Sequence, residues 1–386
     1  MIQLKDKSDC CGCTACASIC PRDAILMKPD ALGFKYPKIN LAKCIDCGLC
    51  EKVCAFNENY DKSLNFAEPN IYAARHKDMH EIETSRSGAA FIAISDYVLE
   101  NGGIVYGVGY RDHFVVTHKR ATTKEERNEF KGSKYVQSDL DGIFRQVKND
   151  LKDGKMVLFS GTPCQTAGLN SFVGKKLREN LILVDIVCHG VPSPYVWRDY
   201  LEYIERKFRD NVIKVDFRDK SRIGWKGHIE TFVFENGDKK EFKLYTNLFY
   251  QNIMLRESCG KCYYTNFFRP SDFTLADYWG WNKISSDFNI DNKGCSLLLI
   301  NTLKSQSIFE KIKCNLFLIR SNKNLCIQPN LSHPTIMNCN SQKFIIDYKK
   351  KGIEVVLRKY KNRDCNKKIY YYINKIKRIF NFIFKK

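Results

Sequence analysis

The sequence lacks any long hydrophobic run. No apolar stretch among its 386 residues approaches the roughly 18 residues that span a bilayer, so we expect no membrane-spanning helix. A secretory signal is also missing, because the residues that precede Cys10, MIQLKDKSD, are few and polar. Without such a signal, the 18 cysteines favour metal binding in a reducing compartment over disulfide bonds. We therefore expect a cytoplasmic protein.

Acidic residues are scarce relative to basic ones. The chain has 43 Asp and Glu against 63 Lys and Arg, which gives a formal net charge of +20. The excess is local, since residues 349–386 hold 14 basic and 2 acidic side chains. The rest of the chain carries no basic stripe of the kind that marks a nucleic-acid-binding surface. We therefore expect no nucleic-acid partner.

A glycine-rich dinucleotide fingerprint is absent too. Gly107 and Gly109 lie in a predicted strand over 104–110, but no helix starts after them, as the fingerprint requires. Helices are predicted over 87–103, with Ser87 as N-cap, and over 140–151. They alternate with apolar strands over 156–160 and 181–187. This alternation is typical of a largely parallel sheet that is covered on both faces.

What the sequence does contain is a doubled cysteine motif. Two copies of C-x2-C-x2-C-x3-C have the spacing of bacterial two-cluster ferredoxins, and Pro21 follows the first copy. Each [4Fe-4S] cluster takes three thiolates from one copy and the fourth from the other copy. The predicted ligand sets are Cys10, Cys13, Cys16 and Cys54 for one cluster and Cys44, Cys47, Cys50 and Cys20 for the other.

Two zinc knuckles are the alternative interpretation of these cysteines. A zinc site needs four ligands and gains nothing from a cysteine that is shared across repeats, so iron–sulfur is favoured. Cys11 is an extra thiol that we expect beside a cluster. Residues 1–60 are therefore predicted to form a two-[4Fe-4S] ferredoxin-type domain.

A second set of cysteines follows the predicted strands. The loops that contain Cys164 and Cys188 come directly after the strands over 156–160 and 181–187, and the carboxyl ends of parallel strands meet at one sheet edge. Cys259 and Cys262 add a C-x2-C pair. Four thiolates suit either zinc or a third [4Fe-4S] cluster, and their spacing does not decide between the two.

Six stretches, in order along the chain, carry a family resemblance: RSGAAF (86–91), KGSKYVQS (131–138), LFSGTPCQ (158–165), VCHGVPSP (187–194), LRESCGKCYY (255–264) and RPSDFTLADYWG (269–280). They resemble the beta-subunit family of coenzyme F420-reducing hydrogenases and dehydrogenases. The resemblance implies an α/β flavoprotein domain over 70–345 that binds FAD, and iron–sulfur at the second cysteine set. It also implies electron exchange with a redox partner protein or a small carrier, which is a deazaflavin in the methanogen enzymes. Many bacterial members occur with surface-polysaccharide genes.

The predicted function is that of an iron–sulfur flavoprotein oxidoreductase. FAD exchanges two electrons and clusters exchange one, so the pair converts between the two modes. The predicted fold class is α+β, with the ferredoxin-like domain before the flavin-binding α/β domain. The rival interpretations are a non-catalytic electron-delivery subunit and a reductase of a sugar-linked intermediate in polysaccharide assembly. The candidate flavin contacts are Ser87, Gly88, Lys131, Ser133, Lys134 and Thr162.

The C-terminal tail over 349–386 is predicted to end in a basic amphipathic helix. Its apolar residues from Ile369 to Phe384 recur at helical spacing, and most lysines lie off that face. Such a helix can lie on the anionic inner face of a membrane. The alternative is a helix that packs its apolar face on the protein body.

Overall fold

The computed structural model describes residues 1–361. The predicted amphipathic helix over 369–384 lies outside these residues. Among the described residues, no helix has both the length and the apolar character that crossing a bilayer requires.

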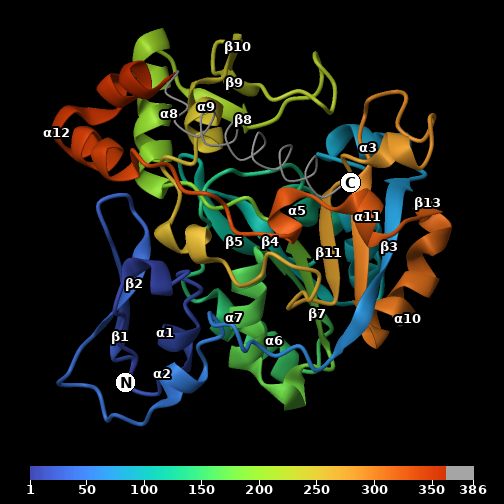
Figure 1. Ribbon diagram of the computed structural model, residues 1–386, viewed down its shortest axis with the longest axis horizontal. Helices are drawn as coiled ribbons and strands as arrows, with labels where there is room; N and C mark the ends of the chain where they lie inside the picture. The colour runs from blue at the N-terminus through green and yellow to red at the C-terminus, as the bar shows by residue number, and fades with distance from the viewer. Residues whose placement is uncertain (362–386) are drawn as a thin grey trace, which may run out of the picture.

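The N-terminal residues form a small unit of short elements (Figure 1). A β-hairpin forms its sheet, with Ile25 opposite Ile39. Glycine permits the positive φ of Gly48, which precedes the second short helix. The elements are α1 (Ala15–Ile19), β1 (Ile25–Pro29), β2 (Lys35–Ile39) and α2 (Leu49–Lys52).

The main body is built on an eight-stranded mixed sheet in the order β13-β3-β12-β11-β7-β6-β4-β5. Its centre is parallel, since β7 pairs in parallel with β6 and β11, and β6 pairs in parallel with β4. Antiparallel strands complete both sides, which confirms the predicted fold class. The strands are β3 (Asn65–His76), β4 (Ile104–Arg111), β5 (Val115–Ala121), β6 (Val157–Gly161), β7 (Leu181–Ile186), β11 (Phe273–Asp277), β12 (Ser296–Thr302) and β13 (Leu316–Arg320).

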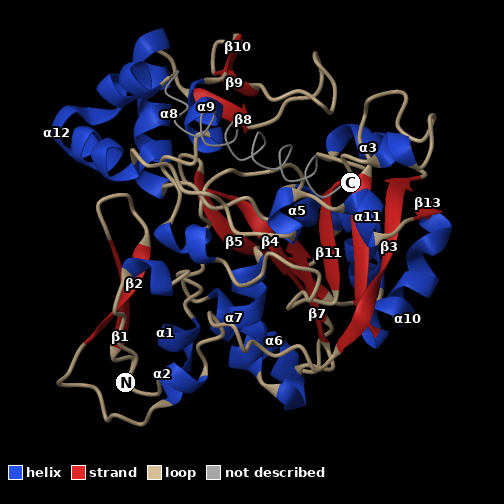
Figure 2. Cartoon of the chain, in the orientation of Figure 1, coloured by secondary structure: helices blue, strands red, loops and turns tan. Residues whose placement is uncertain are grey.

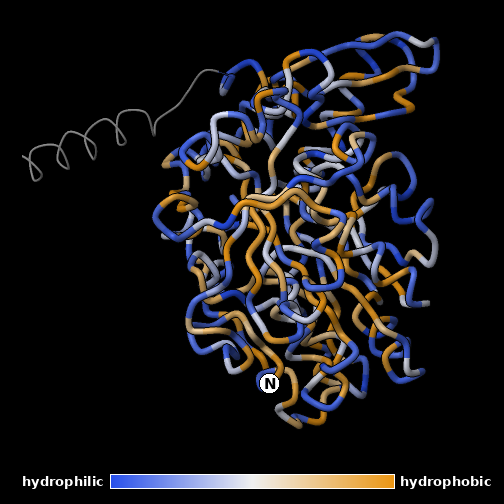
Figure 3. The backbone as a smooth tube through the Cα atoms, turned by 90° about the vertical axis from the view of Figure 1, so that its right-hand side faces the viewer, coloured by the Kyte–Doolittle hydropathy of each residue, from blue (hydrophilic) through white to orange (hydrophobic). Residues whose placement is uncertain are grey.

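Helices cover both faces of this sheet (Figure 2). Successive residues of β6 point to opposite faces, so Leu158 packs with α4 and α10, whereas Phe159 packs with α6 and α7. The central strands accordingly form a hydrophobic interior (Figure 3). The helices around the sheet are α3 (Met79–Thr84), α4 (Ala90–Glu100), α5 (Lys124–Asn128), α6 (Ile143–Lys152), α7 (Pro163–Val173), α10 (Leu303–Ile312) and α11 (Lys323–Cys326).

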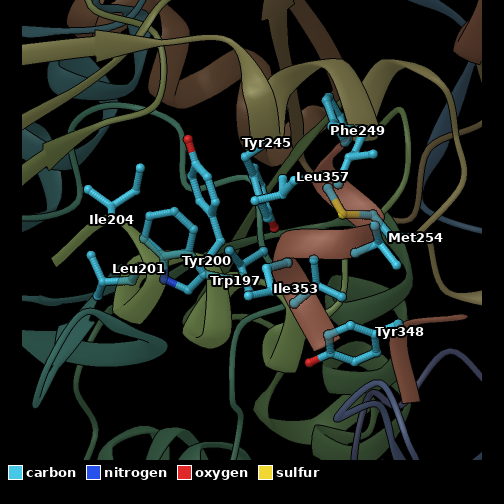
Figure 4. Close-up of a cluster of buried hydrophobic side chains, with 14 of the residues drawn as sticks. Trp197, Tyr200, Leu201, Ile204, Tyr245, Phe249, Met254, Tyr348, Ile353 and Leu357 are labelled. Carbon is cyan, nitrogen blue, oxygen red and sulfur yellow. The ribbon is translucent and has the colours of Figure 1, made fainter. Parts of the chain in front are cut away.

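A smaller sheet in the order β10-β9-β8 carries a second core. Trp197, Tyr200, Tyr245 and Leu357 are fully or almost fully buried there (Figure 4). The tail predicted from residue 349 thus begins inside a packed helix, α12. The elements are α8 (Pro194–Phe208), β8 (Val212–Asp216), β9 (Glu230–Phe234), β10 (Lys239–Phe242), α9 (Leu244–Tyr250) and α12 (Ser341–Tyr360).

Glu230 is a carboxyl group buried in this second core. Its Oε1 accepts a hydrogen bond of 2.9 Å from the Thr246 amide, and burial raises its pKa from 4.5 to about 7. Because the unfolded chain ionises this group earlier, the free energy of unfolding should fall as the pH rises from about 4.5 to about 7. Glu230→Gln should remove up to roughly 3 kcal/mol of that loss, as measured by anaerobic denaturant unfolding at several pH values. The exposed Glu235→Gln variant is the control, and equal pH slopes in the two variants would contradict the assignment.

Candidate redox site

Cys20 lies with the second cysteine triplet around one small cavity of about 20 Å³. Apolar side chains, including Ile25 and Ile39 of the hairpin, complete its wall. Backbone amides point at the sulfurs: Ala24 N donates to Cys20 Sγ at 3.3 Å, and Ile2 N donates to Cys50 Sγ at 3.2 Å. The four thiols around this hollow, Cys20, Cys44, Cys47 and Cys50, are the set that the cysteine spacing predicts for one [4Fe-4S] cluster.

The other N-terminal thiols also form a group. Burial raises the pKa of Cys16, and Cys13, Cys10 and Cys54 raise it further, which shows that the four lie close together. Burial and the same neighbours raise the pKa of Cys54 to about 11. Gly12 N donates to Cys10 Sγ at 3.4 Å. The structure thus brings together the four cysteines that the sequence predicts as ligands of the first [4Fe-4S] cluster: Cys10, Cys13, Cys16 and Cys54.

Arg256 places a buried cation beside this group. Its guanidinium is 1% exposed and donates to Cys10 O at 2.8 Å and to Gln137 Oε1 at 3.0 Å. Its Nη2 lies 3.7 Å from Cys10 Sγ, and its Cζ lies 4.2 Å from the centre of the Tyr36 ring. No carboxylate pairs with Arg256 within the part of the chain that the structure describes. Thiolates of a bound cluster would supply the missing negative charge.

Sheet topology brings Cys164 and Cys188 together. Cys164 is the second residue of α7, directly after β6, and Cys188 follows the neighbouring strand β7. The Thr162 N-cap and Pro163 start α7, and Thr162 Oγ1 lies 3.3 Å from Cys164 Sγ. Cys164 therefore stands at the carboxyl edge of the central strands.

Cys259 and Cys262 reach the same place from the 3-10 helix η3 (Glu257–Lys261) and its C-cap. Val191 N, from the loop after Cys188, donates to Cys259 Sγ at 3.4 Å. Burial raises the pKa of Cys259 and Cys262 to about 12, and the other thiols of the set contribute. Burial also raises the pKa of Cys188, and the charges of Cys259, Cys164 and Cys262 raise it further. The structure thus gathers the second cysteine set.

A four-iron cluster is larger than an ion, and its thiolates bind different iron atoms. Within residues 1–361, no three His, Cys, Asp or Glu side chains form a group that could hold a single metal ion. The eight N-terminal cysteines likewise form no group of that single-ion kind.

The two cysteine regions adjoin through Cys11 and α7. Cys11 is 4% exposed, and hydrogen bonds with Cys13 and Cys164 raise its pKa, so its thiol lies between the two sets. A Cβ atom at Gly168, one turn after Cys164, would lie 2.7 Å from Cys13 Sγ. Only a glycine allows α7 this close to the N-terminal domain.

A cavity of about 740 Å³ opens beside the second cysteine set. Its wall contains Gly161, Val187 and Asp277, from the carboxyl ends of β6, β7 and β11. Cys188 lines it too. Both the position and the volume suit a ligand site of an α/β sheet.

Five of the six predicted flavin contacts line this cavity: Ser87, Lys131, Ser133, Lys134 and Thr162. Gly88 does not line it, because Gly88 packs against the sheet, where an added Cβ would lie 2.2 Å from Ala74 O.

Two of these contacts have local partners as well. Lys131 pairs with Glu81 at 2.6 Å. Burial lowers the pKa of Lys134 to about 7, and its Nζ donates to Glu129 O at 2.7 Å.

The sequence predicts Ser87 as the N-cap of the helix α4, and that prediction is wrong. The helix begins at Ala90 after Ala89, whose φ is 61°. The Ser87 hydroxyl instead donates to Cys295 O at 2.8 Å. Sequence reasoning also missed Arg86 and Arg218 in the cavity wall. The sequence does mark Arg86, because it is the first residue of RSGAAF, one of the stretches that carry the family resemblance.

Two known families match parts of the chain. Residues 9–57 match the 4Fe-4S dicluster domain, and residues 154–322 match the C terminus of the coenzyme F420 hydrogenase/dehydrogenase beta subunit. These matches confirm the predicted resemblance and the iron–sulfur chemistry of the N-terminal domain, whose role is electron transfer.

Among solved structures, one chain of the F420-reducing [NiFe] hydrogenase complex from Methanosarcina barkeri is similar to this chain at 15% identity and a TM-score of 0.47. The match covers 77% of this chain and 92% of that one. No curated protein matches the sequence.

Proposed function

We propose that this chain, which carries the C-terminal domain of the coenzyme F420 hydrogenase/dehydrogenase beta-subunit family behind a 4Fe-4S dicluster domain, is an FAD-dependent iron–sulfur oxidoreductase. The observation that carries the proposal is the shared position of Cys188, which belongs to the second cysteine set and also lines the cavity. A flavin in this cavity would adjoin a third cluster.

The second cysteine set would hold that third [4Fe-4S] cluster. Its thiols come from three places in the sequence, the charges of neighbouring thiols raise the pKa of Cys188, Cys259 and Cys262, and its donors are all sulfur. The neighbouring Thr162 hydroxyl can donate to Cys164 Sγ. Cys11, packed between Cys13 and Cys164, joins this set to the N-terminal one. All three clusters would therefore lie along one path.

FAD, when bound, would take up or release a pair of electrons on the side of the substrate and single electrons on the side of the clusters. The protein's part is to bind and orient it. Lys134 and the backbone around Gly132 and Ser133 line one wall, and Thr162 lines the cavity next to Cys164. His189 lines the cavity, and its Nε2 is hydrogen-bonded to Asn252 Oδ1 at 2.6 Å, so its imidazole can hold a proton near the ligand.

The electron partner that we propose is a redox protein or a soluble carrier, of which a deazaflavin is one chemical class. The link to polysaccharide assembly and the membrane contact of the C-terminal tail remain proposals from sequence.

Flavin content tests the proposal directly. The anaerobically purified chain should retain about one FAD, with flavin absorption bands above the cluster background. Ser133→Trp should obstruct the cavity and abolish FAD retention while leaving the iron content unchanged, because Ser133 lines the cavity and belongs to no cysteine motif. The exposed Ser332→Trp variant is the control. A brown wild-type protein that neither retains nor takes up FAD would instead support the electron-delivery subunit.

A further inference from the structure

Two arginines in the cavity wall converge on one carbonyl. Arg86 Nη2 and Arg218 Nη2 both donate to Trp225 O, the latter at 3.3 Å. Arg218 also pairs with Asp277 Oδ2 at 2.6 Å and donates to the Tyr135 hydroxyl at 3.3 Å. The two guanidinium groups therefore lie side by side at this carbonyl.

Arg86 carries hydrogen-bonding capacity that the protein does not use. Its Nε and Nη1 are buried without a partner in the described part of the chain, as is Nε of Arg218. Arg86 pairs with none of the described carboxylates. A buried guanidinium with unused donors is costly, so these donors suit a ligand bound in the cavity.

The surroundings compensate the positive charge of this pair only in part. Burial lowers the pKa of Arg86 to about 10, and the charge of Arg218 lowers it further. Burial lowers the pKa of His228 to about 3, and the charges of Arg218 and Arg86 contribute to this lowering. Among residues 1–361, the cavity wall contains four Lys and Arg side chains (Arg86, Lys131, Lys134 and Arg218), and Asp277 is its one carboxylate.

An aromatic wall stands next to the arginine pair. Trp279 lines the cavity, stacks on Trp225 at 4.7 Å and has Arg218 Cζ 5.6 Å from its ring centre. Tyr135 lines the cavity and stacks on Phe249 at 4.8 Å. A ligand that combines an anionic group with a planar ring would meet both features.

We propose that Arg86 and Arg218 form an anion subsite that binds a phosphate or diphosphate group of the cavity's ligand. The forked N–H donors of arginine match phosphate oxygens in pairs, and a multiply charged anion would balance two cations of which only Arg218 pairs directly with a carboxylate. The group belongs either to the cofactor's diphosphate or to a phosphorylated substrate. The first source rests on the proposed flavin function, whereas the second does not.

The test compares ligands with and without the phosphate. Arg86→Gln should weaken FAD binding to the flavin-free chain by about tenfold or more, and should leave the binding of riboflavin, which has no phosphate, unchanged. Inorganic diphosphate should raise the thermal midpoint of the wild type but not of Arg86→Gln. Arg222→Gln is the matched control, because Arg222 is exposed and pairs with Glu241.

Stability separates this subsite from a structural role for Arg86. The unliganded Arg86→Gln variant should melt no lower than the wild type, because it removes an unpaired buried charge.

The outcomes identify the source of the phosphate. Loss of FAD affinity alone assigns it to the cofactor. Unchanged FAD binding with lost diphosphate binding assigns it to a substrate. Diphosphate binding that depends on Arg86, in a wild type that binds no flavin, supports the subsite and rejects the flavin function. Equal responses of wild type and Arg86→Gln to both FAD and diphosphate would overturn the subsite.

Discussion

Replacing Cys259 with alanine should lower the iron content of the anaerobically purified chain from about twelve to about eight atoms, since one of three four-iron clusters loses a ligand. The N-terminal clusters should survive, because their thiols all belong to residues 1–60. Val191 N would also lose its acceptor on Cys259 Sγ. Iron analysis and the cluster absorption band measure the change.

Cys314→Ala is the matched control for Cys259→Ala. Cys314 is exposed and belongs to neither cysteine set, so its replacement should leave about twelve iron atoms per chain. A wild-type content of about eight, unchanged by Cys259→Ala, would reject the third cluster. One zinc per chain that is lost in Cys259→Ala would show that the second cysteine set holds zinc.

Arg256→Met should destabilise the protein by about 3 kcal/mol, because the variant leaves buried carbonyls and a cluster without their cation. Arg256 donates to Cys10 O, Lys35 O and Gln137 Oε1, and so joins the N-terminal domain to the main body. Cleavage between residues 57 and 64 by added protease should become faster, as the domains separate more often. Anaerobic denaturant unfolding and limited proteolysis are the two measurements.

Two further variants define what Arg256 does. Arg256→Lys keeps the charge but has fewer donors, so its stability should fall between the wild type and Arg256→Met. The exposed Arg222→Gln should behave as the wild type. Unchanged stability and proteolysis in Arg256→Met would show that Arg256 does not hold the two domains together.

Local sequence predicted the parts of the site that depend on spacing or on strand order. The cysteine spacing predicted the dicluster domain, which the family match confirms. The positions of Cys164 and Cys188 directly after two apolar strands predicted that they meet, since parallel neighbours end at one edge.

The parts that the sequence did not predict depend on contacts between distant residues. Arg256 lies 246 positions from Cys10, and nothing around it in the sequence marks it as a partner of that cysteine. Ser87 resembled an N-cap because serine commonly caps helices, but tertiary packing gave its hydroxyl to Cys295 O. Strand β3 begins at Asn65, although residues 57–70 are polar, because pairing with β12 and β13 outweighs their composition.

The number of electrons that the chain accepts tests the central claim most directly. Stepwise anaerobic titration with dithionite, followed by absorption, should consume about five electrons per chain, one for each of three clusters and two for the flavin. The flavin bands and the cluster bands should both bleach. Consumption of about two electrons, with no flavin band at any stage, would contradict the account and leave a two-cluster electron-delivery protein.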